Sequence, residues 1–495
     1  MSGDLQRVEL DDDTDDASRF GQSEHADARG EDGPRRSRRG RVVLGVGAAL
    51  VVAGLVAAQA VLDARERDAV AALREVRGVL APIGDSLEVA YSVPGLQWLE
   101  LPKDDDVLLL VTADGGTGSH LRAVDAETGV ARWDVPVGAQ VATAQGVQCG
   151  AGRLDGVGAV VACLDTDGGV RWDDDGQSER RPATYARVLV HAQDDGRQVA
   201  AWDLDLTDEG FAVLDGQVAA VARDGADLVV TAHDLATGQQ RWRRSLVGAG
   251  GEQAEGDVDA YYTSVNVLVG GGAFVVSAPD GSQVVVAADG TVLPPTRGVN
   301  WVGPDTRTLV VDINADDADG ARTALVRDGV LSPAVRGTAV STGVDDGSFG
   351  DVVFTSADGL TAWDATTGAR RWATDGDDGV ATYHGVLVAR GTVYGWGPSG
   401  LTAFDRDGHV RWRHALPDEA TPSNVSTDGE RLYVVVDTSD GQEPSVPEVQ
   451  ALTFDGEPAG RVAVPRDIRW LSPINHRFWG SVVTDDGESS IAVLR

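Results

Sequence analysis

Apolar and polar residues alternate in short segments from about residue 95 to the end of the chain. Typical segments are Leu121-Arg-Ala-Val, Leu360-Thr-Ala-Trp and Leu401-Thr-Ala-Phe, and each is followed by an Asp and then a Gly. Period-two alternation is typical of β-strands with one buried face. An Asp opens a tight turn, and a Gly supplies the positive φ that such a turn needs. The pattern therefore predicts a series of β-hairpins.

One phrase, Ala-x-Asp-x-x-x-Gly-x-x-x-Trp, marks these hairpins. Complete copies end at Trp133, Trp242 and Trp372, a copy one residue shorter ends at Trp412, and a looser one ends at Trp172. Weaker copies centre on Asp194–Gly196, which leads into Trp202, and on Asp289-Gly290, Asp328-Gly329 and Asp455-Gly456. A spacing of about 40–50 residues is typical of four-stranded propeller blades, which are stable only beside their neighbours. We therefore predict an all-β fold for residues 95–495, a β-propeller of seven or eight blades with eight preferred.

The repeated phrase resembles the tryptophan-docking motif of the pyrroloquinoline-quinone (PQQ) repeat family. That family includes quinoprotein dehydrogenases as well as assembly and scaffold proteins without a cofactor, and the resemblance covers roughly residues 95–495. It implies that the Trp of each copy packs between adjacent blades. The docking residues expected on this basis are Trp133, Trp172, Trp242, Trp372 and Trp412.

Quinoprotein enzymes of this family hold their cofactor with more than the docking phrase. They carry adjacent paired cysteines, a calcium site of Glu and Asn, and a catalytic Asp. In this sequence the cysteines, Cys149 and Cys163, are not adjacent, and no matching cluster of acidic and amide residues can be assigned. We therefore expect no cofactor, no metal and no catalytic residue, and PQQ with calcium is the alternative.

An uncharged apolar segment of 21 residues, 42–62, precedes the repeats. A helix of this length crosses the ~30 Å hydrocarbon layer of a membrane. Five arginines lie on its N-terminal side, at positions 35, 36, 38, 39 and 41. Because positive charge stays on the cytoplasmic side, we predict a single-pass helix with the propeller outside the cytoplasm. The alternative is a signal peptide cleaved near Ala58-Gln59-Ala60.

The segments on either side of this helix complete the predicted organisation. Residues 1–41 are rich in Asp and poor in large apolar residues, which predicts a disordered cytoplasmic tail. Residues 63–94 are predicted to form a helical stalk and linker, with the helix continuing to Pro82. An apolar stripe runs along this stalk at Ala69, Leu73, Val76 and Leu80. It favours an amphipathic helix, and a dimeric coiled coil is the alternative.

Cys149 and Cys163 are the two cysteines of the chain. Both fall in the compartment predicted to be oxidising, on either side of a short Gly-rich loop. An even count outside the cytoplasm favours a disulfide between them.

Two further motifs imitate known sites. Gly84-Asp85-Ser86-Leu87 spells the signature of a hydrolase family with a nucleophilic Ser, but the Asp-x-x-His that would activate the Ser is absent from the sequence. Residues 312–320 partly imitate a calcium loop, but Asp317 and Thr323 stand where Gly and Glu are required. We interpret both motifs as coincidental.

The net charge of −36 disfavours nucleic acid as a partner, because phosphate backbones are repelled. The combined features predict a membrane-anchored binding or scaffold module, whose partner is a protein, a glycan or a small molecule. The alternatives are a PQQ-dependent oxidoreductase and the ectodomain of a ligand sensor.

Overall fold

The chain forms two units, residues 1–64 and residues 65–495. The computed structural model describes residues 38–100, 106–114, 118–138, 147–167, 169–172, 178–181, 183–205, 210–224, 227–246, 265–278, 282–294, 296–301, 308–313, 321–374, 382–417, 420–437, 447–483 and 489–495. The predicted cytoplasmic tail lies almost wholly outside these residues.

Helix α1 (Arg38–Arg74) includes the whole of the apolar segment 42–62. Among the helix residues whose side chains are described, no stretch is long and apolar enough to cross a membrane. The prediction that the helix continues to Pro82 is wrong, because α1 ends at Arg74 and Gly78 has a φ of 88°. Positive φ ends a helix, and the chain beyond Gly78 is extended.

The C-terminal end of α1 packs on the propeller. Leu73 is buried and joins an apolar cluster with Tyr394, Leu432 and Val434. Arg74 also makes a 2.8 Å ion pair with Glu430. Leu73, Val76 and Leu80 of the stripe that suggested a coiled coil thus pack against the protein's own blades, whereas Ala69 is exposed.

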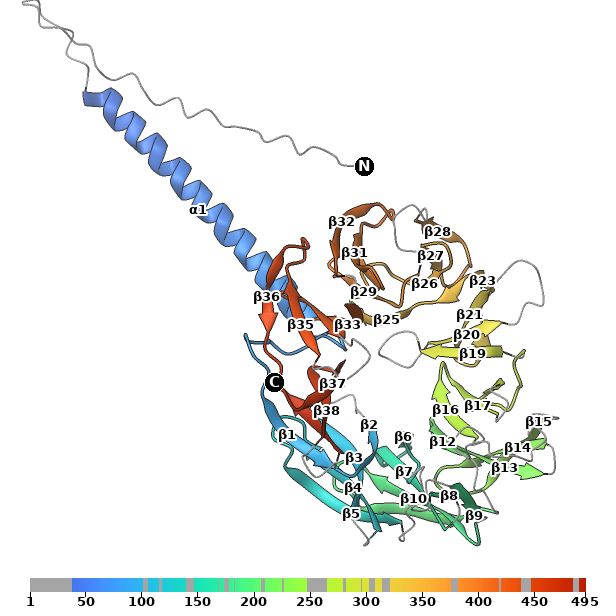
Figure 1. Ribbon diagram of the computed structural model, residues 1–495. Helices are drawn as coiled ribbons and strands as arrows, with labels where there is room; N and C mark the ends of the chain where they lie inside the picture. The colour runs from blue at the N-terminus through green and yellow to red at the C-terminus, as the bar shows by residue number, and fades with distance from the viewer. Residues whose placement is uncertain are drawn as a thin grey trace, which may run out of the picture. The chain divides into compact units, whose positions relative to one another are not determined.

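Nine blades follow one another in chain order in the described strands (Figure 1). Blade 1 consists of β2 (Leu96–Glu100), β3 (Val107–Asp114), β4 (Gly118–Asp125) and β5 (Ala131–Gly138). Blade 2 consists of β6 (Cys149–Leu154), β7 (Gly158–Thr166), β10 (Ala186–Ala192) and β11 (Gln198–Asp203). Blade 3 consists of β12 (Gly210–Leu214), β13 (Gln217–Asp224), β14 (Asp227–Asp234) and β15 (Gln240–Leu246). Neighbouring strands within each of these sheets are antiparallel.

Blades 4 and 5 share one continuous sheet, because β18 and β19 pair at a single position, Gln283 with Thr296. Blade 4 contains β16 (Asn266–Gly270), β17 (Ala273–Ser277) and β18 (Gln283–Ala287), and blade 5 contains β19 (Thr296–Trp301), β20 (Leu309–Ile313), β21 (Arg322–Arg327), β22 (Val330–Leu331) and β23 (Val335–Arg336).

Blades 6 to 8 return to the simpler pattern. Blade 6 consists of β24 (Thr338–Ala339), β26 (Val352–Ser356), β27 (Leu360–Asp364) and β28 (Arg370–Ala373). Blade 7 consists of β25 (Ser341–Asp345), β29 (Gly385–Ala389), β30 (Thr392–Gly397), β31 (Gly400–Phe404) and β32 (Val410–Ala415). Blade 8 consists of β33 (Thr421–Thr427), β34 (Leu432–Asp437), β35 (Glu448–Leu452) and β36 (Pro458–Val462). β25 is parallel to β29 and adds a fifth strand to blade 7.

Blade 9 is built from both ends of the chain. It contains β37 (Ile468–Ile474), β38 (Arg477–Val483), β39 (Ser489–Leu494) and, from the N-terminal side, β1 (Val89–Pro94). This closure explains why the preferred count of eight blades is wrong. Each of the first eight blades contains one of the eight turns marked in the sequence, at Asp125, Asp194, Asp234, Asp289, Asp328, Asp364, Asp405 and Asp455. In blade 9 the third strand ends the chain, so it leaves no turn to count.

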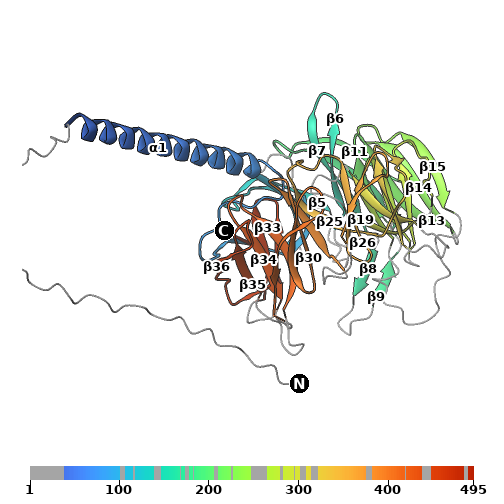
Figure 2. The same ribbon diagram turned by 90° about the horizontal axis from the view of Figure 1, so that it is seen from above.

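The strands β8 (Gly169–Trp172) and β9 (Ser178–Arg181) form a separate two-stranded sheet between β7 and β10. This hairpin extends away from the four strands of blade 2 (Figure 2). Its base is fixed by hydrogen bonds, since the Tyr185 hydroxyl donates to Asp165 at 3.1 Å and Thr166 donates to the Tyr185 carbonyl at 2.9 Å.

Candidate functional site

The repeated phrase builds one turn that recurs in blades 1, 3 and 6. In blade 1, Asp125 Oδ1 accepts hydrogen bonds from the Thr128 amide at 3.0 Å and the Thr128 hydroxyl at 2.9 Å. Gly129 follows with a φ of 69°, and Arg132 donates to Asp125 Oδ2 at 3.1 Å. The same contacts are made in the other two turns by Asp234, Thr237, Gly238 and Arg241 and by Asp364, Thr367, Gly368 and Arg371.

The arginines also set the charge state of these turns. Donation from Arg132 and Thr128 holds the pKa of Asp125 at about 2. Arg371 and Thr367 similarly lower the pKa of Asp364. A carboxylate that stays ionised and fully hydrogen-bonded within its own turn has a structural role, and nothing in this geometry provides an acid or base for chemistry.

The glycine of most of these turns receives an aromatic ring of the preceding blade, whereas Gly329 faces Ala287 and Gly368 faces Pro333. A Cβ added at Gly290 would lie 2.9 Å from the ring of Trp242, and one at Gly456 would lie 2.6 Å from the ring of Trp412. Only glycine allows a ring to stack this closely on the backbone. The pairs of a ring and a turn glycine between blades, among the described residues, are Tyr91–Gly129, Trp133–Gly196, Trp202–Gly238, Trp242–Gly290, Trp372–Gly408 and Trp412–Gly456.

Most of these rings also form a hydrogen bond across the blade interface. The Trp133 indole donates to the Gln193 carbonyl at 2.9 Å, and the Trp412 indole donates to the Phe454 carbonyl at 3.0 Å. Tyr91 donates its hydroxyl to the Ala126 carbonyl at 3.1 Å. These three residues therefore join two blades through both stacking and a hydrogen bond, whereas the Trp372 indole N–H has no partner among the described residues.

Blade 2 differs from the sequence prediction. Its docking position is held by Trp202 on β11, whose indole donates to the Leu235 carbonyl at 3.2 Å. Trp172, which the looser copy of the phrase suggested, lies on β8 of the inserted hairpin. The prediction for Trp172 is wrong because the chain leaves blade 2 after β7 and returns at β10. The sequence feature that correctly marks the docking residue of blade 2 is the Asp194–Gly196 turn, which leads into Trp202.

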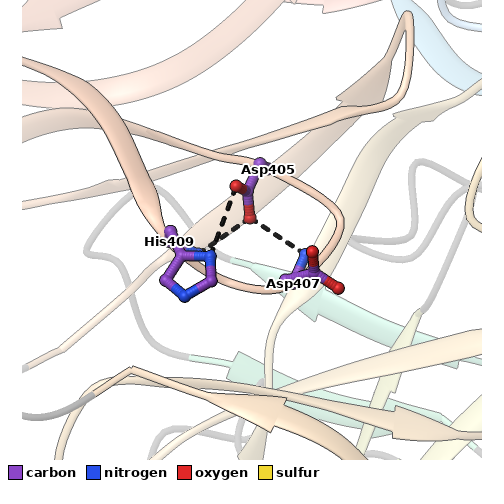
Figure 3. A group of neighbouring side chains, drawn as sticks. All are labelled: Asp405, Asp407 and His409. Atoms are coloured by element: carbon purple, nitrogen blue, oxygen red, sulfur yellow. Dashed lines mark hydrogen bonds and ion pairs between the residues drawn. The ribbon is translucent and has the colours of Figure 1, made fainter.

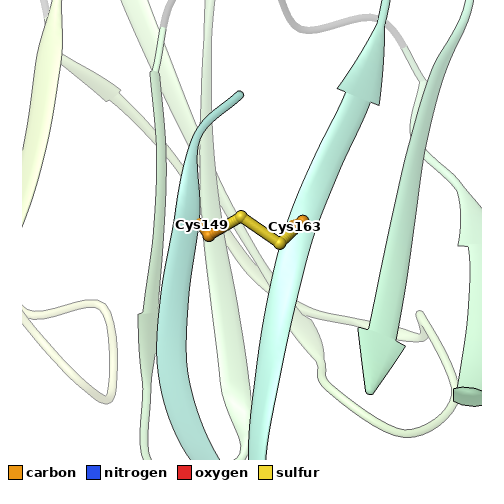
Figure 4. Close-up of a disulfide and its surroundings, with 2 residues drawn as sticks. All are labelled: Cys149 and Cys163. Atoms are coloured by element: carbon orange, nitrogen blue, oxygen red, sulfur yellow. A yellow bond between two sulfur atoms is a disulfide. The ribbon is translucent and has the colours of Figure 1, made fainter. Parts of the chain in front are cut away.

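Cys149 and Cys163 form a disulfide, as the sequence predicts (Figure 4). They stand directly opposite each other on β6 and β7. Both cysteines are buried in the apolar cluster that blades 1 and 2 share, with Leu109, Leu121 and Val161. The disulfide thus reinforces a blade core and is remote from solvent.

One group of side chains in the described part of the chain has the spacing of metal ligands. Asp405, Asp407 and His409 lie on the turn between β31 and β32 (Figure 3). Asp405 already accepts hydrogen bonds from the Asp407 and His409 amides, both at 2.9 Å. This turn also provides Gly408 for the ring of Trp372. The Asp405 carboxylate therefore accepts hydrogen bonds from backbone amides of its own turn, as the carboxylates of Asp125 and Asp234 do.

A cavity of about 130 Å³ lies where blade 2 leads into blade 3. Its lining includes Ala220, Ala222 and Thr231 together with Arg223 and Arg243. Sites for drug-sized ligands usually occupy ~300–1,000 Å³. The cavity is too small for a cofactor the size of PQQ.

The two imitated motifs have different outcomes. Ser86 pairs with Ala463 in a parallel bridge, and Leu87 is buried, so the hydrolase-like signature is part of the propeller's backbone pairing. Most of the calcium-like loop, residues 314–320, lies outside the described residues.

The residues that would hold PQQ in a quinoprotein do not fit this structure. The two cysteines are bonded across two strands and buried, so they cannot form an adjacent pair beside a cofactor ring. The group at Asp405 belongs to a blade turn whose hydrogen bonds it satisfies. No other group of three or more potential metal-ligating side chains occurs among the described residues.

Aromatic residues stacked on turn glycines around a ring define a tryptophan-docked β-propeller. Residues 306–451 match a family model described as outer membrane protein assembly factor BamB. This part of the propeller thus matches a PQQ-like repeat family, as the docking phrase predicted.

Solved structures with similar folds have low sequence identity and low TM-scores. BamB from Moraxella catarrhalis is 14% identical, with a TM-score of 0.38 over 83% of this chain and 97% of that chain. A europium-containing methanol dehydrogenase is 12% identical, with a TM-score of 0.31 over 74% of this chain and 91% of that chain. Among curated proteins, none matches the sequence significantly. Similarity at this level does not bear on function.

Proposed function

We propose that this protein is a scaffold that binds a protein partner through the loops of its propeller. The observation that carries the proposal is that the repeated residues make structural contacts within and between the blades. Asp125, Thr128, Gly129 and Arg132 satisfy one another within a turn, and the docking rings are used in stacking. The segment that matches the family model is described by the name of an assembly factor, which supports a role in binding. Loops on a rigid frame are the usual place for specificity.

The proposal includes attachment to a membrane through residues 42–62, with the propeller outside the cytoplasm. It rests on the uncharged sequence of this segment and on the arginines that precede it. The segment is part of a continuous helix, α1, whose other end contacts blades 7 and 8.

A PQQ-dependent oxidoreductase is the alternative that is simplest to test. Purified full-length protein would be incubated with PQQ and calcium, desalted and examined by absorbance, with a known quinoprotein treated in parallel. We expect no retained PQQ absorbance and no reduction of an artificial electron acceptor by any of a panel of alcohols. Retention of one PQQ per chain together with alcohol-dependent dye reduction would overturn the scaffold proposal.

A further inference from the structure

The interface between blades 8 and 9 lacks the ring-to-glycine contact of the docked interfaces, as do the interfaces where Gly329 faces Ala287 and Gly368 faces Pro333. A docking contact needs a turn glycine in the following blade. The described residues of blade 9 provide none, because its third strand, β39, and its fourth strand, β1, come from opposite ends of the chain. On the blade 8 side, β36 carries no aromatic residue, and Pro458 to Arg461 are exposed. We call this interface the seam.

The segment Val79–Glu88, which we call the strap, occupies the seam. At its start, the Leu80 amide donates to the Thr427 carbonyl of blade 8 at 2.7 Å. The next amide, that of Ala81, donates to the His476 carbonyl of blade 9, also at 2.7 Å. Two successive residues of the strap therefore bond to two different blades.

The second half of the strap repeats this arrangement. The Leu87 amide donates to the Ala463 carbonyl at 2.8 Å, and the Ala463 amide donates to the Asp85 carbonyl at 2.9 Å. Ala463 directly follows β36 of blade 8. Glu88 and Arg495 exchange both backbone hydrogen bonds, at 2.9 and 3.0 Å, which joins the strap to the end of blade 9.

Two leucines of the strap are buried in the seam. Leu80 is 1% exposed and Leu87 is 4% exposed. Both belong to one apolar cluster that contains Tyr433 and Val462 of blade 8 and Phe478 of blade 9. A buried leucine is among the larger apolar contributions to an interface. The two leucines thus supply at the seam an apolar contact comparable to the one that a docking ring supplies at the ring-docked interfaces.

We propose that the strap is a latch that closes the propeller. When the strap is seated, blades 8 and 9 are joined through it. When it is displaced, the ring opens at the seam while the ring-docked interfaces remain closed. Because the strap continues directly from α1, a pull on that helix or proteolysis between residues 79 and 88 acts on ring closure. The latch is independent of the identity of the partner.

Hydrogen exchange measured by mass spectrometry on the full-length protein tests the latch. The variant is Leu80→Ala with Leu87→Ala, and the matched control is Leu228→Ala, which removes a fully buried leucine from blade 3. We expect amide exchange in β36, β37 and β1 to rise at least roughly tenfold in the strap variant, with little change in β13 and β14. The control should show the opposite distribution.

If the double variant does not fold, Leu87→Ala alone should show the same localised increase at a smaller size. An equal increase in all blades, or an increase at the seam in the Leu228→Ala control as large as that in the strap variant, would contradict the latch. So would unchanged exchange at the seam in the strap variant.

Discussion

Replacing Trp372 with Ala should lower the free energy of unfolding by roughly 3–5 kcal/mol, because a large buried ring is removed from a blade interface. Trp372 is 7% exposed, stacks on Phe404 with ring centres 6.0 Å apart and covers Gly408. Chemical denaturation followed by tryptophan fluorescence and circular dichroism measures the change. Trp470→Ala is the matched control, since that side chain is 47% exposed and should contribute little.

A conservative substitution separates ring packing from hydrogen bonding. Within the described residues the Trp372 indole N–H has no hydrogen-bond partner, whereas that of Trp412 donates to Phe454. Trp372→Phe should therefore cost less than Trp412→Phe, which leaves a carbonyl unpaired. If Trp372→Ala were as stable as Trp470→Ala, or if it abolished partner binding without loss of stability, these rings would not be structural docking residues.

Removal of the disulfide should have the second largest effect. The sulfurs of Cys149 and Cys163 close a loop with a sequence separation of 14, and the chain-entropy model gives about 3 kcal/mol for a loop of this size. Cys149→Ser with Cys163→Ser should lower the free energy of unfolding by about that amount. Reduction of the unaltered protein with dithiothreitol under denaturing conditions, followed by refolding with the thiols kept reduced, provides the comparison.

The thiol content of denatured, unreduced protein checks the bond itself. We expect no reaction with a thiol reagent before reduction and two equivalents afterwards. Two equivalents before reduction would show that the bond does not form in the protein as produced.

The sequence predicted the repeated features of this fold and missed those that occur once. An Asp, a Gly and a Trp at constant spacing have one physical role in every blade, so each copy supports the others. Blade 9 was not predicted from the sequence, because its third and fourth strands lie at opposite ends of the chain. Trp172 was assigned wrongly because its local sequence imitates the phrase, while its strand pairs with β9 outside the blade.

The strap shows why non-repeating contacts are hard to predict. Leu80 belongs to a stripe with helical spacing, and Leu87 follows Ser86 in an apparent hydrolase signature. In the structure both leucines are buried between blades 8 and 9, which lie more than three hundred residues away along the chain. No local pattern encodes a contact of this separation. The same limit applies to the partner, whose binding loops follow no repeat.

Site-specific photo-crosslinking in intact cells tests the scaffold proposal most directly. A photoreactive amino acid would replace Val157, in the turn between β6 and β7, or Tyr185, at the base of the inserted hairpin, and both side chains are 38% exposed. Val330, which is 67% exposed at the start of β22, is the control at the outer edge of a blade. We expect a discrete protein adduct at one of the first two positions and none at Val330. Equal labelling at all three positions, or no adduct at Val157 and Tyr185, would contradict the proposal.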